Sequence, residues 1–131
     1  MIALKHTQTL QQNSGISEII MPQRQNDSLE LLLPMLAHLS RQTDERWMTW
    51  IAAPQLSKAL VTHYGFNLNK VRLMHSQSDE ESLWLSWEAL NNGTSAYVVT
   101  HLQQAHTFHA KERGQLEVAA NYGYSRGLII K

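Results

Sequence analysis

One pattern in this sequence matches a known catalytic motif, the G-x-S-x-G nucleophile elbow of α/β-hydrolases. It is formed by Gly123, Ser125 and Gly127. The elbow needs a strand before its serine, a helix after it, and the acid and histidine of the triad later in the chain. Here a helical segment precedes the serine and a strand follows it, and only Leu-Ile-Ile-Lys comes after Gly127. The pattern therefore predicts a helix end that leads into the last strand, not a serine nucleophile.

Three histidines lie close enough in the sequence to hold a metal ion together. They are His101, His106 and His109, and Glu112 could complete a three-ligand set on one helix face. The chain has no cysteine, which excludes thiolate ligands and disulfides, and it has no H-E-x-x-H motif. A solvated loop and a first helical turn explain the same histidines without a metal. A metal site is therefore an alternative, which zinc-dependent stabilisation would test.

The sequence lacks the glycine-rich loops that hold phosphates. None of its six glycines forms G-x-x-x-x-G-K-[ST] or G-x-G-x-x-G, and the segment 22–28, after the first expected strand, has no glycine at all. The acidic cluster at 79–81 follows Ser78 in a capping box, so helix capping explains it. The sequence carries no enzyme signature. A small regulatory α/β domain that binds a nucleotide or a metal is the alternative function.

The composition indicates one folded domain. Of the 131 residues, 43% are apolar and 17% are charged, which suits a packed core and excludes a disordered chain. Eleven basic residues balance eleven acidic ones, so there is no excess charge to attract nucleic acid or an anionic membrane. No apolar run approaches the about 20 residues that span a bilayer, and the polar start does not resemble a signal peptide. We therefore expect a cytoplasmic protein that binds neither nucleic acid nor membrane.

Strand patterns and helical patterns alternate along the chain. Residues 1–14 are polar and weakly patterned, so we expect a loose N-terminal arm before a single domain over 15–131. A polar turn around Asn26 and Asp27 should follow the first strand. Strict alternation requires crossover connections, hence an α/β fold with a mostly parallel five-stranded sheet and helices on both faces. The expected strands are 15–21, 46–52, 71–75, 95–100 and 125–130, and the expected helices are 28–41, 55–64, 78–91 and 106–121.

Several aromatic and basic residues suit contact with a protein partner. Trp, Tyr and Arg supply much of the binding energy at protein interfaces, and this short chain has four tryptophans. Trp50 and Trp87 fit the core. Arg46, beside Trp47, and Lys70 stand at the starts of the second and third expected strands, so we expect both in loops at one end of the sheet. Ordinary solvated surface cations are the alternative for this pair.

Longer stretches of the sequence resemble the SulA family, the bacterial SOS cell-division inhibitors. Three motifs carry the resemblance: L-L-L-P-x-L at 31–36, R-W-x-x-W at 46–50 and G-x-x-x-x-K-V at 65–71. The similarity extends to residues 15–20, 88–93 and 119–123. It covers roughly 15–130, with order and spacing almost fully kept.

The resemblance implies both a fold and a function. The implied fold is RecA-like α/β without the phosphate loop, and the implied protein is not an enzyme and needs no cofactor. Members of the family are made after DNA damage and bind FtsZ, the tubulin-like division GTPase. They block its polymerisation and septum formation, and they can associate as dimers. We therefore expect an FtsZ inhibitor, and a SulA relative with a different protein partner is a further alternative.

The resemblance also points to individual residues. The residues important for inhibition in the family correspond here to Arg46, Ile51, Leu60 and Lys70. Leu60 stands where relatives carry Trp, a change that weakens or reshapes a contact. Ile51 lies inside an expected strand, so we expect it to support the fold rather than touch the partner. The sequence ends at Lys131, before the His-containing tail that the Lon protease recognises in relatives, which leaves Lon-mediated turnover in doubt.

Overall fold

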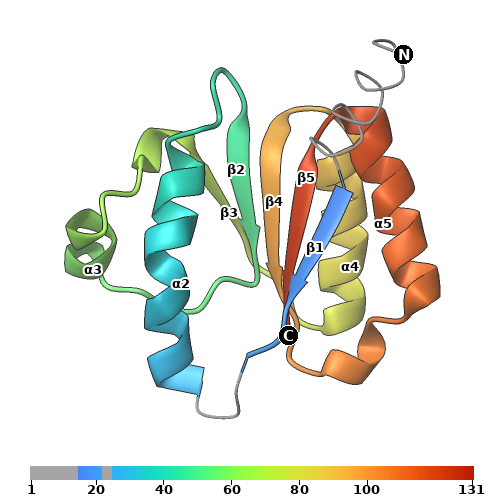
Figure 1. Ribbon diagram of the computed structural model, residues 1–131, viewed down its shortest axis with the longest axis horizontal. Helices are drawn as coiled ribbons and strands as arrows, with labels where there is room; N and C mark the ends of the chain where they lie inside the picture. The colour runs from blue at the N-terminus through green and yellow to red at the C-terminus, as the bar shows by residue number, and fades with distance from the viewer. Residues whose placement is uncertain (1–14, 22–24) are drawn as a thin grey trace, which may run out of the picture.

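The strands of the chain form one parallel sheet. The computed structural model describes residues 15–21 and 25–131, and the expected arm over 1–14 lies outside them. The strand order is β1-β5-β4-β2-β3, and each neighbouring pair is parallel (Figure 1). The expected α/β fold is confirmed, with a sheet that is wholly rather than mostly parallel. The strands are β1 (Gly15–Ile19), β2 (Trp47–Ile51), β3 (Val71–Met74), β4 (Ser95–His101) and β5 (Arg126–Ile130).

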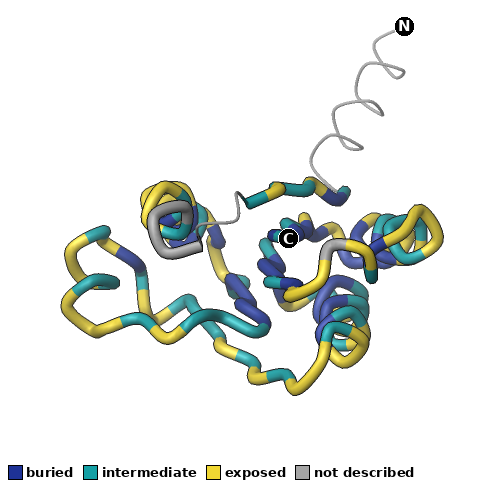
Figure 2. The backbone as a smooth tube through the Cα atoms, turned by 90° about the horizontal axis from the view of Figure 1, so that it is seen from below, coloured by how far each residue is buried: buried dark blue, intermediate teal, exposed yellow. Residues whose placement is uncertain are grey.

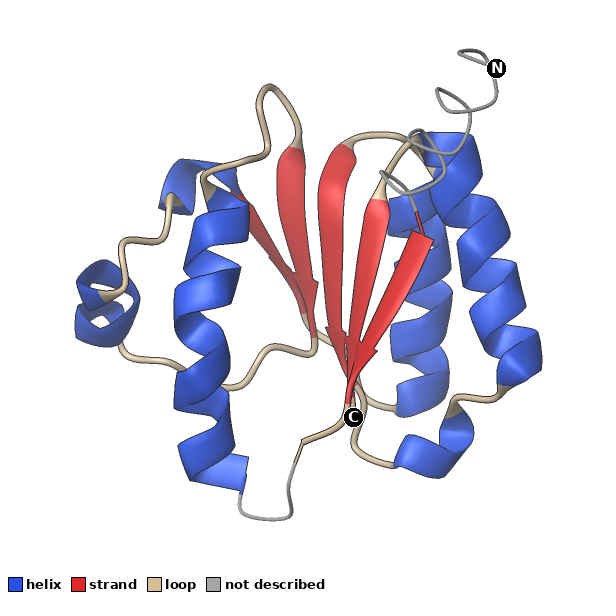
Figure 3. Cartoon of the chain, viewed as in Figure 1, coloured by secondary structure: helices blue, strands red, loops and turns tan. Residues whose placement is uncertain are grey.

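Helices cover both faces of this sheet. Helices α2 and α3 lie on one side of the sheet, and α4 and α5 lie on the other (Figure 3). From β2 the chain moves outward to β3, and from β4 it moves the other way to β5, so right-handed crossovers place the two pairs on opposite faces. The bounds are α2 (Gln25–Ser40), α3 (Lys58–His63), α4 (Asp79–Asn91) and α5 (Ala110–Gly123), with short 3₁₀ turns at η1 (Leu68–Lys70) and η2 (Ala105–Thr107).

Alternate side chains of the central strands fill two separate cores. Val98 packs in the core under α4 and α5, together with Leu90. The next residue, Val99, points to the opposite face and packs with Leu33 of α2. Figure 2 shows the buried residues gathered between the layers and the exposed ones on the outer faces of the helices. Burial on both faces explains why β2 is apolar at nearly every position.

Some element ends differ from the expected ones. The polar turn expected around Asn26 and Asp27 was wrong, because α2 begins at Gln25 and takes both residues into its first turn. Asn and Asp are as well suited to a helix start as to a turn, so the sequence pattern alone does not separate the two. Helix α5 begins at Ala110 rather than at His106, which belongs to η2. Helix α3 is also shorter than expected.

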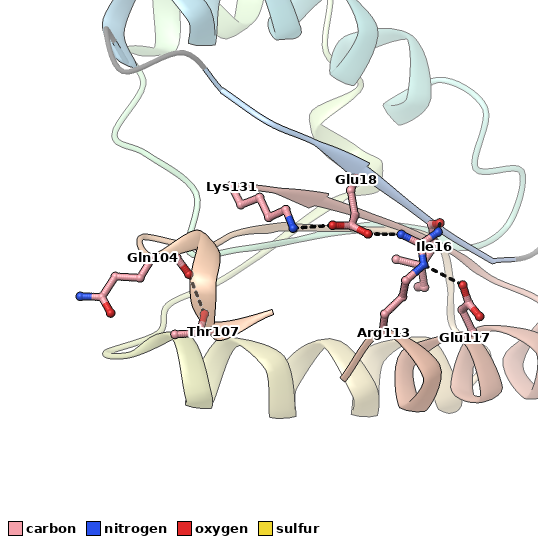
Figure 4. Close-up of polar contacts among 7 residues, drawn as sticks. All are labelled: Ile16, Glu18, Gln104, Thr107, Arg113, Glu117 and Lys131. Carbon is pink, nitrogen blue, oxygen red and sulfur yellow. Dashed lines mark hydrogen bonds and ion pairs between the residues drawn. The ribbon is translucent and has the colours of Figure 1, made fainter. Parts of the chain in front are cut away.

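Charged side chains fasten the edge strand β1 to the rest of the domain (Figure 4). Arg113 of α5 forms an ion pair with Glu18 and donates a hydrogen bond of 2.8 Å to the Ile16 carbonyl oxygen. Lys131 Nζ lies 2.5 Å from the other oxygen of Glu18. The hydrogen bond from Lys131 is the main cause that lowers the pKa of the Glu18 carboxyl, and Arg113 acts in the same direction. The ionised carboxylate therefore links β1 to α5 and to the end of β5.

Candidate partner-binding site

The structure brings together two of the four residues that the family resemblance selects. Arg46 immediately precedes β2, and Lys70 is the last residue of η1, immediately before β3. Because the strands are parallel, both residues lie at the edge of the sheet where the strands begin. Ile51 ends β2 at the opposite edge and is fully buried. Leu60 lies on α3, half-buried against the core beneath α2 and α3.

Polar and aromatic residues lie near Arg46 and Lys70, where the strands begin. We call this group the amino-end face. Its tryptophan ring is shared by two cations: Lys70 Nζ lies 5.8 Å from the centroid of Trp47, and Arg72 Cζ lies 5.6 Å from it. Both distances are within the range of a cation–π contact. The face consists of Arg46, Trp47, Lys70, Arg72, Thr94 and Tyr124.

Arg72 is held in place by hydroxyl groups. Its Nη2 donates to Thr94 Oγ1 at 2.9 Å and to Thr49 Oγ1 and Ser95 Oγ at 3.1 Å each. Thr49 and Ser95 are buried and hydrogen-bonded to each other at 2.7 Å. Buried polar groups need hydrogen-bond partners, and the Arg72 guanidinium supplies donors to the hydroxyl oxygens of Thr49 and Ser95. Arg72 therefore has a fixed orientation beside the Trp47 ring.

Arg46 is held by backbone carbonyl oxygens from two other parts of the chain. Its Nη1 donates to the carbonyl of Tyr124 at 2.7 Å, and more distantly to those of Ser95 at 3.3 Å and Gly123 at 3.5 Å. These carbonyls belong to the start of β4, to the last residue of α5 and to the turn that follows it. Arg46 therefore joins the beginnings of β2, β4 and β5.

The G-x-S-x-G pattern proves to be a packing motif, as the sequence predicted. Ser125 Oγ donates a hydrogen bond of 2.8 Å to the carbonyl oxygen of Leu90, in the last turn of α4. The Gly123 backbone lies against the same carbonyl, and Gly127 lies under the Ile16 side chain. Ser125 is fully buried, so its hydroxyl closes a helix end rather than attacking a substrate.

The histidines do not assemble a metal site. Within the part of the chain that the structure describes, no three His, Asp or Glu side chains are placed to hold an ion. His101 Nε2 accepts a hydrogen bond of 2.9 Å from Trp50 Nε1, and burial lowers the pKa of His101 to about 4. His106 and His109 are exposed, and His109 only precedes α5.

The acidic cluster at the start of α4 has a structural role. Ser78 Oγ accepts a hydrogen bond from the Glu81 N–H at 3.1 Å, which confirms the expected helix cap. The Asp79 carboxylate accepts from the N–H groups of Gln103 at 2.8 Å and Gln104 at 2.9 Å. These contacts fix the loop between β4 and α5.

Sequence reasoning located only part of the amino-end face. The positions of Arg46, Trp47 and Lys70 follow from strand starts, which the apolar patterns mark. Arg72 and Tyr124 were missed. Arg72 is a lone arginine inside a short strand pattern, and the sequence does not show that buried hydroxyl groups bind it. The positive φ angle of Tyr124 has no sequence signal in the G-Y-S-R-G segment beyond the neighbouring glycine.

The helices of residues 25–131 show no membrane span, since none combines sufficient length with sufficient hydropathy.

Comparison with known proteins agrees with the resemblance. The family model described as "Cell division inhibitor SulA" matches residues 14–127. The chain is 32% identical to the cell division inhibitor SulA of Pseudomonas aeruginosa, over 94% of this chain and 75% of that protein. It is 29% identical to the SulA of Serratia marcescens, over 97% of this chain and 73% of that protein.

The same agreement holds in three dimensions. The crystal structure of SulA from Pseudomonas aeruginosa matches with a TM-score of 0.79 at 33% identity, over 88% of this chain and 96% of that chain. The expected RecA-like architecture is confirmed by this match. Sequence and structure therefore lead to one conclusion: the chain belongs to the SulA family, the SOS-related, non-enzymatic cell division inhibitors.

Proposed function

We propose that this chain inhibits cell division by binding FtsZ, and that the amino-end face makes the contact. Membership of a family of division inhibitors supports the first part. The second part rests on one observation: Arg46 and Lys70, which are distant in sequence, lie at the same end of the strands, with Lys70 beside the Trp47 ring and Arg46 bound to the Tyr124 carbonyl oxygen. A protein seated on the FtsZ surface that receives the next subunit would stop the polymer from growing.

The chemistry of the amino-end face suits such a partner. Trp and Tyr provide large contact areas, and cations held in fixed positions select carboxylates on the other protein. The chain has no net charge, so its binding depends on packing and on oriented cations more than on long-range attraction. An interface of standard size, about 1,600 Å² in total, is sufficient. At about micromolar affinity, inhibition needs nearly equal amounts of the two proteins.

The other two residues that the family resemblance selects, Ile51 and Leu60, lie outside the amino-end face. Ile51 is fully buried, so it supports the sheet and does not touch FtsZ directly. Leu60 packs α3 onto the core, and the short segment 64–67 joins α3 to η1, which carries Lys70. We propose that Leu60 helps to place η1. The smaller side chain, compared with the Trp of relatives, buries less area there.

Sedimentation of FtsZ polymers in the presence of GTP tests the proposed function. Adding this protein in increasing amounts should remove FtsZ from the pellet, with nearly complete loss close to equimolar ratio. If the pellet is unchanged at a several-fold molar excess of folded protein, FtsZ is not the partner, and a SulA relative directed at another protein becomes the better interpretation.

Substitution of Lys70 should weaken inhibition without disturbing the fold. Lys70→Ala removes the cation above the Trp47 ring, so the concentration for half-maximal inhibition should rise about tenfold. Circular dichroism and the melting temperature should stay close to those of the wild type. The matched control is Lys111→Ala, an exposed lysine at the other end of the sheet in the first turn of α5. Equal losses in the two variants would show that Lys70 contributes only general charge.

A further inference from the structure

The backbone of Tyr124 adopts a conformation that tyrosine rarely takes. Its φ and ψ angles are 52° and 43°, in the left-handed region, where it caps α5. Glycine usually occupies this position at a helix end because a side chain there is strained. Among the described residues, positive φ without glycine occurs also at Asp44 and Ala52, neither of which is aromatic.

The Tyr124 side chain gives little to the fold in return for this strain. It is 73% exposed and makes no part of either core. A glycine at this position would hold the same turn with less strain. A strained backbone conformation persists only where the surrounding structure holds it in place. Such positions are found most often at functional sites.

Arg46 holds the Tyr124 backbone in this conformation. Arg46 Nη1 donates to the Tyr124 carbonyl oxygen at 2.7 Å, its shortest hydrogen bond, and the two longer ones also end on backbone carbonyls. The Tyr124 N–H is bound by the last turn of α5. Both sides of the Tyr124 peptide are therefore fixed, while its exposed side chain lies at the start of β5, at the end of the sheet where β2 and β3 also begin.

We infer that Tyr124 is a direct contact for FtsZ and that Arg46 is a positioning residue, which acts on inhibition by fixing Tyr124. This inference rests on the proposed function. It names a contact that the family resemblance did not select, and it gives Arg46 a different role from that of a charge presented to the partner. The matching surface on FtsZ should be apolar where the ring packs, with an acceptor for the phenol hydroxyl.

Tyr124→Gly separates function from stability. We expect the concentration for half-maximal inhibition of FtsZ sedimentation to rise about tenfold or more. The melting temperature should stay the same or rise by about 3 °C, because glycine relieves the strain. Unchanged inhibition would overturn the inference. A clear fall in melting temperature would overturn it as well, since the ring would then belong to the fold.

A matched control removes an exposed aromatic ring elsewhere. Trp84 of α4 is 58% exposed and stacks on Trp87, away from the amino-end face. Trp84→Ala should keep inhibition within about twofold of the wild type. If it loses as much as Tyr124→Gly, exposed aromatic area in general decides binding, and Tyr124 has no special role. Failure of the wild-type protein to inhibit FtsZ would count against the proposed function instead.

The role of Arg46 is tested by a double-mutant comparison. Arg46→Ala alone should weaken inhibition, because it releases the Tyr124 carbonyl oxygen; unchanged inhibition would overturn the positioning role. In the Tyr124→Gly background, Arg46→Ala should add less than about a twofold further loss, since the two residues act as one unit. A full additional loss would show that Arg46 acts independently.

Discussion

Gly123→Ala should destabilise the domain by about 3 kcal/mol or more, the largest effect that we expect from a single methyl group. A Cβ atom at position 123 would lie 1.8 Å from the Leu90 carbonyl oxygen and 3.2 Å from the Gly93 nitrogen. Both are backbone atoms, so the end of α4 must move away from α5. That movement also disturbs the hydrogen bond from Ser125 to Leu90. Denaturant unfolding followed by circular dichroism measures the change.

The same helix contains the matched control. Gly114 lies in α5, and a Cβ atom added there meets nothing within 4 Å. Gly114→Ala should therefore be neutral or stabilising by about 0.5–1 kcal/mol, because alanine favours helix. Similar stabilities for the two variants would contradict the close approach of α4 and α5 at Gly123.

Acidification from pH 7.5 to pH 5 should lower the free energy of unfolding by about 2 kcal/mol through His101. Burial lowers the pKa of His101 from 6.5 to about 4, and its Nε2 accepts a hydrogen bond from Trp50. Below about pH 6.5 the unfolded chain binds a proton that the folded chain does not bind. The stabilisation from this residue is therefore complete above that pH and is lost as the pH falls toward 4.

A variant that cannot titrate isolates this contribution. His101→Gln keeps an acceptor for the Trp50 N–H and all the other histidines, so its stability should fall less over the same range. The range ends at pH 5 because the Glu18 carboxyl, whose pKa is lowered, gains its proton only at more acidic pH. Parallel pH profiles for the variant and the wild type would show that His101 titrates normally in the folded protein.

The sequence predicted the fold because its strand and helix patterns are strong. The apolar run of β2 and the cap at Ser78 mark elements whose side chains behave locally as their types suggest. The helix starts were less predictable. The first turn of α2 contains Asn26 and Asp27, which favour turns equally, and its placement depends on packing that the sequence does not display.

The candidate site was predictable only where it depends on strand starts. Arg46 and Lys70 lie together because parallel strands begin at one edge, which alternation of strands and helices implies. The contacts of Arg46 with Ser95 and Tyr124 join residues 49 and 78 positions apart. No local pattern encodes such pairings. The burial of Ile51 was correctly expected, since it lies inside a strand.

Site-specific photo-cross-linking to FtsZ tests the central claim most directly. A photoreactive residue replaces Asn69, which is exposed beside Lys70, or in a second variant Trp84 on α4. The account predicts a cross-link to FtsZ from position 69 and none from position 84. Cross-linking from position 84 alone, by a protein that still inhibits polymerisation, would show that FtsZ binds another surface.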